Sequence, residues 1–218
     1  MTGPKPTRHT VSVVSEPVAV FVLRVWLPDR PGGLGAVASR VGAVGGDVVG
    51  IEIIERGGGR AVDDLVVEIP GPELLELLLK EVNQVDGVDV EDVRAVDRAP
   101  VDLAVAALEV AARVASTTSA GARTDELLAG VVELVHADWV AVADPMAGEL
   151  SASVGAELPS EAWIVAFAAG VPAGTDPAGV PELVVSSLGD GRVLVAGRSS
   201  APFRTRERDL VHSLARLA

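Results

Sequence analysis

The chain has 218 residues, of which 49% are hydrophobic and 22% are charged, and its formal net charge is −13 at pH 7. This composition is typical of a globular protein rather than a disordered one, and the length suits two domains of about 100 residues each. The acidic excess would repel nucleic-acid phosphates and anionic lipid, so neither is an expected partner. Because the chain has no cysteine, disulfides, thiol catalysis, iron–sulfur clusters and thiolate zinc sites are excluded.

The N-terminal segment is not expected to be a signal peptide. Residues 1–17 contain three prolines, and no continuous apolar segment follows them before the first predicted strand. We expect residues 1–16 to form a flexible leader. The longest uncharged apolar run, residues 162–171, is much shorter than the roughly 20 residues of a membrane helix, so we expect a cytoplasmic protein without membrane association.

A strand and a helix open the predicted structure. Residues 18–27 are rich in β-branched and large apolar residues and are followed by Pro28, which cannot donate to a strand ladder. Residues 33–44 predict a helix that ends before Gly45-Gly46. Its apolar residues have the spacing of one helix face and are Leu34, Val37, Ala38 and Val41.

Two strands are predicted next, at residues 47–55 and 61–69, and the three glycines at 57–59 suit a hairpin turn between them. In the second of these strands, apolar residues alternate with polar ones such as Asp64 and Glu68. One face of the sheet should therefore meet helices, and the other should face water or a partner.

A helix at residues 73–84 and a last strand at residues 88–96 complete the first predicted domain, which we place at residues 17–98. The inward residues of this helix are predicted to be Leu74, Leu75, Leu78 and Val82. The resulting order βαββαβ predicts an α+β, ferredoxin-like fold with two helices on one face of a four-stranded sheet.

The segment between the first strand and the first helix, residues 29–34, has the chemistry of a ligand-binding loop. Its proline fixes φ, and its glycines allow close approach of another molecule to the backbone. The helix start that follows presents unpaired N–H groups and a partial positive charge, which suit a carboxylate. The alternative is a tight turn that needs glycine for its geometry alone. No phosphate-binding motif follows Leu27.

Asp29-Arg30-Pro31-Gly32-Gly33-Leu34 and the later Gly46-Asp47-Val48, within this order of elements, resemble the ACT domain, a small regulatory module that binds amino acids. The resemblance covers residues 17–98. It implies a ligand site in the loop and at the start of the second strand, and a homo-oligomer in which the bound amino acid lies between subunits.

The resemblance also assigns roles to single residues. The ligand α-carboxylate would meet the backbone N–H groups of Gly32, Gly33 and Leu34, while Asp47, expected close to the loop, would accept from the ammonium group. Val48 would contribute backbone groups. These contacts would together hold a zwitterion.

Three further interpretations concern the same segments. Pro31 would fix the loop, Asp29 would cap the helix or hold the loop, and Arg30 would project to solvent or to a partner subunit. For Asp47 the alternative is a residue that only caps the turn after Gly45-Gly46.

The second predicted domain covers residues 101–218 and begins after the aperiodic segment 97–100. Helices are predicted at residues 101–115, from Thr124 as N-cap, and at residues 206–217. Strands are predicted at residues 139–143, 150–154, 184–188 and 193–197.

This half resembles a reduced GAF domain in its two opening helices, the strand segment 136–142, the hairpin 188–197 and the segment 202–207 before the last helix. The resemblance implies a GAF/PAS-like fold with a central antiparallel sheet flanked by helices. Residues 162–169 are readable as strand or helix. The cyclic-nucleotide signature of the family is absent, and without cysteine no bilin can be attached, so no cofactor is expected.

No catalytic or metal-binding constellation is predicted. His9, His136 and His212 lie in different segments without metal-ligand spacing. Asp63 and Asp64 are adjacent on a strand and therefore point to opposite faces. We expect that the chain is not an enzyme.

The only local concentration of positive charge lies in the last predicted helix. The cluster consists of Arg204, Arg206 and Arg208 with Arg216, is interrupted by acidic residues and has no aromatic residues between its members. This pattern favours a solvated helix face.

The sequence thus predicts a non-catalytic regulatory protein, a homodimer that binds a small amino acid through its ACT-like domain. A rearrangement of the dimer or of the domains would pass the signal to a protein partner. The alternative is a constitutive dimerisation or protein-interaction scaffold without a ligand.

Overall fold

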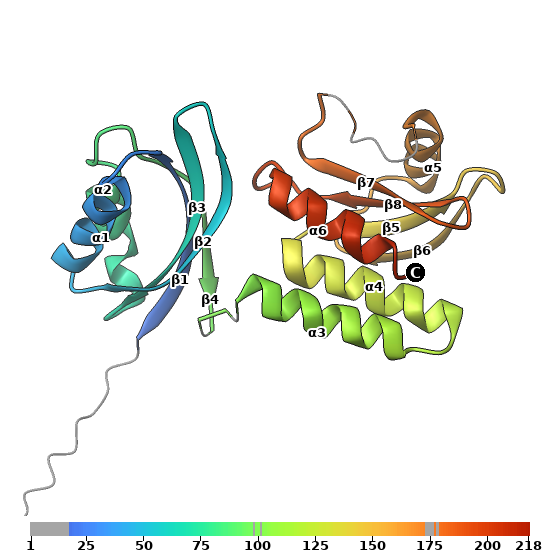
Figure 1. Ribbon diagram of the computed structural model, residues 1–218, viewed down its shortest axis with the longest axis horizontal. Helices are drawn as coiled ribbons and strands as arrows, with labels where there is room; N and C mark the ends of the chain where they lie inside the picture. Colours follow the sequence, from blue (N-terminus) through green and yellow to red (C-terminus); the bar gives the residue numbers. More distant parts are fainter. Residues whose placement is uncertain (1–17, 98, 101, 173–176, 178) are drawn as a thin grey trace, which may run out of the picture.

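The computed structural model describes residues 18–97, 99–100, 102–172, 177 and 179–218. These residues form two four-stranded antiparallel sheets with separate apolar cores, so the predicted α+β class is confirmed (Figure 1). The predicted leader, residues 1–16, and the predicted first residue of the second domain, Val101, lie outside the described residues.

The N-terminal half, residues 18–97, has the predicted order βαββαβ. Its strands are arranged β2-β3-β1-β4, and both α-helices cover the same face (Figure 1). The elements are β1 (Ala19–Pro28), α1 (Gly33–Ala43), β2 (Asp47–Gly57), β3 (Arg60–Ile69), the 3-10 helix η1 (Pro72–Leu74), α2 (Leu75–Val82) and β4 (Asp89–Val96).

Local chemistry sets two of these boundaries. Pro28 is the last residue of β1, at the end of the ladder opposite Arg60. The helix predicted at residues 73–84 is instead a 3-10 turn followed by a shorter α2, and Pro72 stands at its first turn, where its fixed φ is tolerated.

The core of this half lies between the sheet and its two helices. Leu23, Leu65, Val37, Val41 and Leu78 are fully buried there, and each such side chain contributes about 1.5–3 kcal/mol through the apolar area it removes from water. Of the predicted inward residues of the second helix, Leu78 and Val82 are fully buried, whereas Leu74 and Leu75 are only partly buried.

The β2–β3 hairpin turns at Gly58 and Gly59, which have φ values of 59° and 78°. Two consecutive positive φ values are those of a type I′ turn, whose twist matches that of the strands. This turn accepts a hydrogen bond from the backbone of Asp29, so it fastens the candidate loop to the end of the sheet.

The C-terminal half, residues 102–218, contains the second sheet, with strand order β6-β5-β8-β7. Helices α3, α4 and α6 cover one face and α5 covers the other (Figure 1). The elements are α3 (Leu103–Ser116), α4 (Ala120–Val135), β5 (Trp139–Asp144), β6 (Glu149–Gly155), α5 (Glu161–Gly170), β7 (Leu183–Leu188), β8 (Arg192–Gly197) and α6 (Thr205–Ala215).

Two details of this half differ from the sequence interpretation. Residues 162–169, which the sequence left open between strand and helix, belong to α5. Thr124 is not an N-cap, because α4 begins one turn earlier after Ser119, and the buried Thr124 hydroxyl donates to the Ala120 carbonyl at 3.1 Å. None of the helices in the described ranges has the length and hydropathy needed to cross a membrane.

Candidate functional site

The loop between β1 and α1 is held by its own backbone. Gly32 is the N-cap of α1 and has a φ of 89°, in the left-handed region that favours glycine. Its carbonyl accepts from Ala36 at 3.0 Å, and the N–H of Gly33 donates to the Arg30 carbonyl at 3.1 Å. A Cβ on Gly33 would lie 2.8 Å from the carbonyl oxygen of Pro28, so the close approach of these two segments requires glycine.

Four of the predicted site residues line one pocket of about 290 Å³ beside this loop. The pocket lies between the loop, the start of α1 and the connection from α2 to β4. It is lined by Pro28, Arg30, Pro31, Gly32, Gly33, Ala36, Val85 and Asp86. The N–H of Gly33 is engaged with Arg30, which leaves Gly32 and Leu34 as the backbone donors proposed for a carboxylate.

Three of the other predicted residues line a second pocket, a groove of about 440 Å³ along α1 and β2, whereas Asp29 lines neither pocket. The helix side of this groove is smooth, because the residues there beyond Leu34 are glycine or alanine. Its lining consists of Leu34, Gly35, Ala38, Gly42, Gly46, Asp47, Val48 and Ile51. The groove connects the first turn of α1 with the start of β2.

The expectation that Asp47 lies close to the glycine loop is wrong. Asp47 pairs with Glu68, which pairs with Val20 near the start of β1, whereas the loop follows Pro28 at the end of β1. The 11 residues of α1 span this distance, which amounts to about 16 Å at 1.5 Å per residue. The helix carries the chain back to the opposite end of the sheet, so one small amino acid cannot contact both Gly32 and Asp47 of the same chain.

Asp29 does not cap α1. The N-cap is Gly32, without a side-chain cap, and Asp29 is exposed and donates its backbone N–H to Gly59 at 3.0 Å. Asp29 therefore holds the loop, the second of the two roles considered for it. Arg30 is exposed, as expected for a residue that projects to solvent or to a partner.

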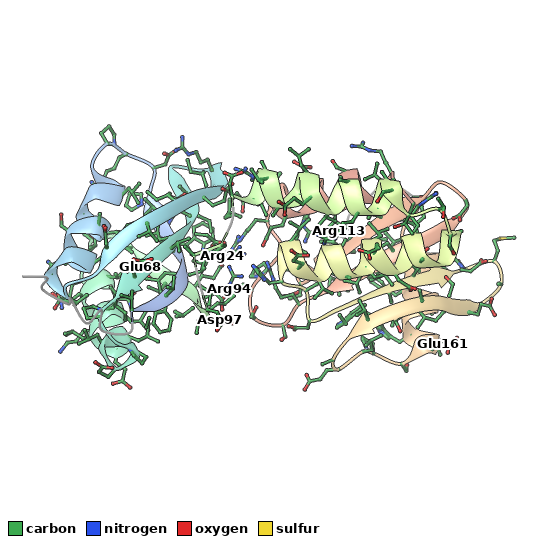
Figure 2. The ribbon with its side chains drawn as sticks, turned by 90° about the horizontal axis from the view of Figure 1, so that it is seen from below. Arg24, Glu68, Arg94, Asp97, Arg113 and Glu161 are labelled. Atoms are coloured by element: carbon green, nitrogen blue, oxygen red, sulfur yellow. The ribbon has the colours of Figure 1, made fainter. Side chains whose placement is uncertain are left out.

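A cluster of buried charges lies on the opposite face of the same sheet, which is turned toward the C-terminal half. Figure 2 shows Arg24 and Arg94 at this junction. The Nε and Nη2 atoms of Arg24 donate to the two carboxylate oxygens of Asp64 at 2.7 and 2.9 Å, and Nη2 also donates to Glu207 of α6 at 3.0 Å. Arg24 is only 3% exposed, so its charge depends on these partners.

Glu207 is the carboxylate on which the cluster converges. It accepts from Nη1 and Nη2 of Arg198 at 2.8 and 3.0 Å and from the backbone N–H of Arg204 at 2.8 Å. Burial acts to raise the pKa of Glu207, but the hydrogen bonds of Arg198 and the charges of Arg24 and Arg198 hold it below the usual range. Glu207 therefore stays ionised in the junction at neutral pH.

Two arginines at the start of α6, the N-cap residue Arg204 and Arg206 in the first turn, contradict the expectation of a solvated helix face. The guanidinium of Arg204 lies 4.7 Å from the ring centroid of Trp26 and pairs with Glu91. Arg206 pairs with Glu52 at 2.5 Å and donates to the Ile53 carbonyl at 3.1 Å. The start of α6 is thus an interface with the N-terminal sheet.

Arg208 is not solvated either, because its guanidinium donates to the carbonyls of Leu183 and Pro181, within the C-terminal half, at 2.9 and 2.8 Å.

Sequence reasoning missed the junction because alternation along a strand shows which residues share a face and not what covers it. The signal was present in Arg24, the one charged residue of an otherwise apolar strand, and in the opposite charge of Asp64 on a neighbouring strand.

Comparison with known proteins identifies part of the N-terminal half. Residues 21–87 match the family model of the ACT domain, so the chain contains an ACT domain there, as the loop motif predicted. The search of curated proteins found no match.

Two solved structures show weak similarity. The ACT domain of a GTP pyrophosphokinase from Chlorobium tepidum has a TM-score of 0.30 and 14% identity, covering 39% of this chain and 93% of that chain. An unknown protein from Galdieria sulphuraria has a TM-score of 0.34 and 12% identity, covering 92% of each chain. Neither assigns a fold to the C-terminal half.

Proposed function

We propose that the chain is a non-catalytic regulatory protein that binds a small amino acid at its ACT domain and converts binding into a rearrangement of a dimer or of its two halves. The ACT domain supports a regulatory, small-molecule-binding role in general. The observation that carries the finer proposal is the separation of two half-sites: a helix start suited to a carboxylate at one end of α1, and the exposed Asp47 at the other end.

This separation favours a site shared by two chains. β2 is an edge strand, and pairing it with β2 of a second chain about a two-fold axis would make the two strands antiparallel. The start of β2 in one chain would then lie near the end of β2 in its partner, which is the end of the sheet that carries the loop. Asp47 of one chain would thereby approach Gly32 of the other.

The surface of β2 supports such pairing. Val49, Ile51 and Ile53 are 43%, 47% and 38% exposed, although they are apolar and lie on an edge strand, which is a template for pairing with another chain. The face of the sheet opposite α1 and α2 is contacted by α6. The edge at β2 is therefore more accessible to a second chain than this face is.

The same apolar edge favours a second candidate, a constitutive dimerisation scaffold without a ligand. Such a scaffold would pair through Val49 and Ile51 whether or not the groove is occupied. It predicts a dimer whose stability does not respond to amino acids.

For the C-terminal half we propose a GAF-like fold without a cofactor. Its antiparallel sheet with helices on both faces supports this assignment. In the proposed function this half passes the signal to a protein partner.

The test is calorimetric titration of the purified chain with each of the twenty amino acids, followed by Gly32→Val and Asp47→Ala. One amino acid should bind, and each variant should abolish the binding. A chain that binds none of the twenty, while sedimentation shows a stable dimer, would support the scaffold instead.

Co-expression of the two variants tests whether the site is shared. A mixed dimer would keep one intact site, formed by the loop of the Asp47→Ala chain and Asp47 of the Gly32→Val chain. Random pairing of a two-fold dimer should restore about one quarter of the wild-type sites. A site within one chain would restore none.

A further inference from the structure

The first turn of α6 contacts three strands of the ACT domain. Arg204 reaches Trp26 on β1 and pairs with Glu91 on β4. Arg206 pairs with Glu52 on β2. With Glu207 bound to Arg24, the beginning of this helix is the part of the C-terminal half that rests on the sheet.

Glu207 serves both halves with the same carboxylate. It holds Arg24 of the ACT domain, and it accepts from the backbone N–H of Arg204, which satisfies a donor at the start of α6. Glu207 and Arg24 are each 3% exposed and Arg198 is 5% exposed. Removal of one partner would leave a buried charge uncompensated, which is strongly destabilising. Arrangements in which only some of these ion pairs are formed are therefore unfavourable.

The ACT end of the contact is directly connected to the candidate loop. Arg24 precedes Pro28, the last residue of β1, by four positions. The ladder between β1 and β4 shifts register between Arg24 and Val25, and such an irregularity changes the direction of the side chains beside it. A displacement of β1 at the loop therefore acts on Arg24.

The other end of the contact leads into the second sheet. The Nδ1 atom of His212 on α6 lies 3.2 Å from the hydroxyl of Ser186 on β7. Arg208 of α6 donates to the carbonyl of Leu183, the first residue of β7. A movement of α6 would therefore displace its contacts with β7.

We infer that α6 is the element through which the ACT domain acts on the C-terminal half, and that the Arg24–Glu207 ion pair couples the two halves. The inference deepens the proposed function, because it names the route by which ligand binding reaches the second sheet. The Arg24–Glu207 ion pair is present without a ligand, so its coupling can be tested without a ligand.

The experiment is amide hydrogen exchange of the full chain, comparing wild type with Arg24→Met. Exchange at residues 206–210, in the other half of the protein, should rise on the order of tenfold, as expected for coupling between contacting charges. The control is Arg113→Met, which removes exposed pairs with Glu126 and Glu133 and should leave α6 unchanged.

A reciprocal variant keeps the inference testable if Arg24→Met fails to fold. Arg204→Gln removes the contacts with Trp26 and Glu91 from the α6 side, and because coupling is reciprocal, exchange should rise in β1 and β4. If each variant raises exchange only in its own half, the two halves are merely adjacent and the inference is wrong. A chain that shows this coupling but binds no amino acid would refute the proposed ligand. The coupling through Arg24 and Glu207 would still stand.

Discussion

The two faces of the ACT sheet use the same strands and meet different partners. On the face under α1 and α2, Leu23 and Leu65 are buried among apolar neighbours. On the other face, the next residue of β1 and the preceding residue of β3, Arg24 and Asp64, form a buried ion pair that continues to Glu207. Apolar contact tolerates many neighbours, whereas the charges are satisfied only when one particular helix is in place.

The difference concerns specificity more than strength. The apolar face is completed by helices that lie next in the sequence, whereas Arg24 and Glu207 are separated by 183 positions. A buried ion pair contributes little net stability over an apolar contact, but it fixes one orientation, since any other leaves charges without partners. The charged face is therefore suited to hold the two halves in one arrangement that a ligand can disturb.

The largest expected effect is that of Arg24→Met. It leaves Asp64 and Glu207 buried without this partner and should lower the free energy of unfolding by about 3–5 kcal/mol, as measured by denaturant unfolding. The matched variant on the other face, Leu23→Ala, should cost about 2–5 kcal/mol through the cavity it creates. Arg24→Met should loosen α6, and Leu23→Ala should not, so loosening by both would remove the distinction between the faces.

A smaller effect is expected in the loop, where the backbone rather than a face is tested. Gly33→Ala brings a Cβ to 2.8 Å from the Pro28 carbonyl and should cost about 1–3 kcal/mol, as overpacking does. Gly35→Ala, two residues further along α1, has nothing within 4 Å of its new Cβ and should be neutral or stabilise α1 by up to about 1 kcal/mol. Thermal unfolding of both variants is the measurement, and equal losses would contradict the close-approach argument.

The two faces also differ in how a buried carboxylate on each makes stability depend on pH. Asp63 shares the helix face with Leu65, and among the described residues its Oδ1 has no hydrogen-bond partner. Burial raises the pKa of Asp63, whereas the pKa of Glu207 at the junction is lowered by its arginines.

The two shifts have opposite consequences. Because Asp63 holds its proton more tightly in the folded chain, its contribution is present at low pH and is lost as the pH rises through its raised pKa. Asp63→Asn should therefore stabilise the chain by about 1 kcal/mol at pH 7, with less gain in acid. The contribution of Glu207 is present at neutral pH and is lost as the pH falls through its lowered pKa. Unfolding curves of wild type and Asp63→Asn across pH 3–8 would contradict this if their difference were constant.

The smallest effect belongs to the exposed ion pairs of the C-terminal half. Arg113 pairs with Glu126 and Glu133 at 3.4 and 2.8 Å, and its side chain is 42% exposed. Arg113→Gln should change stability by less than about 1 kcal/mol, and added salt should reduce the difference further. A loss comparable to that of Arg24→Met would show that burial does not separate the two kinds of pair.

The sequence predicted what depends on neighbouring residues. Alternation in the strand at residues 61–69 predicted a sheet with one face against helices, and the order of elements with residues 29–34 predicted the ACT domain that residues 21–87 match. It misplaced Asp47, because the length of α1 sets the distance from the loop and the spacing of motif residues does not.

The junction was beyond reach for a different reason. Acidic residues interrupt the arginines from Arg206 onward, as on solvated helix faces, and no periodicity indicates that Arg204 contacts Trp26 or that Arg206 pairs with Glu52. Such contacts join segments that are far apart in the sequence, so they become visible only when both halves are placed together.

The most direct test of the central claim, that Arg24 and Glu207 tie the ACT domain to the C-terminal half, is a double-mutant cycle with Arg24→Met and Glu207→Met by denaturant unfolding. The account predicts that the double variant loses less than the sum of the single losses, by about 1–3 kcal/mol. Losses that add within about 0.5 kcal/mol would show that the two residues act independently and would contradict the account.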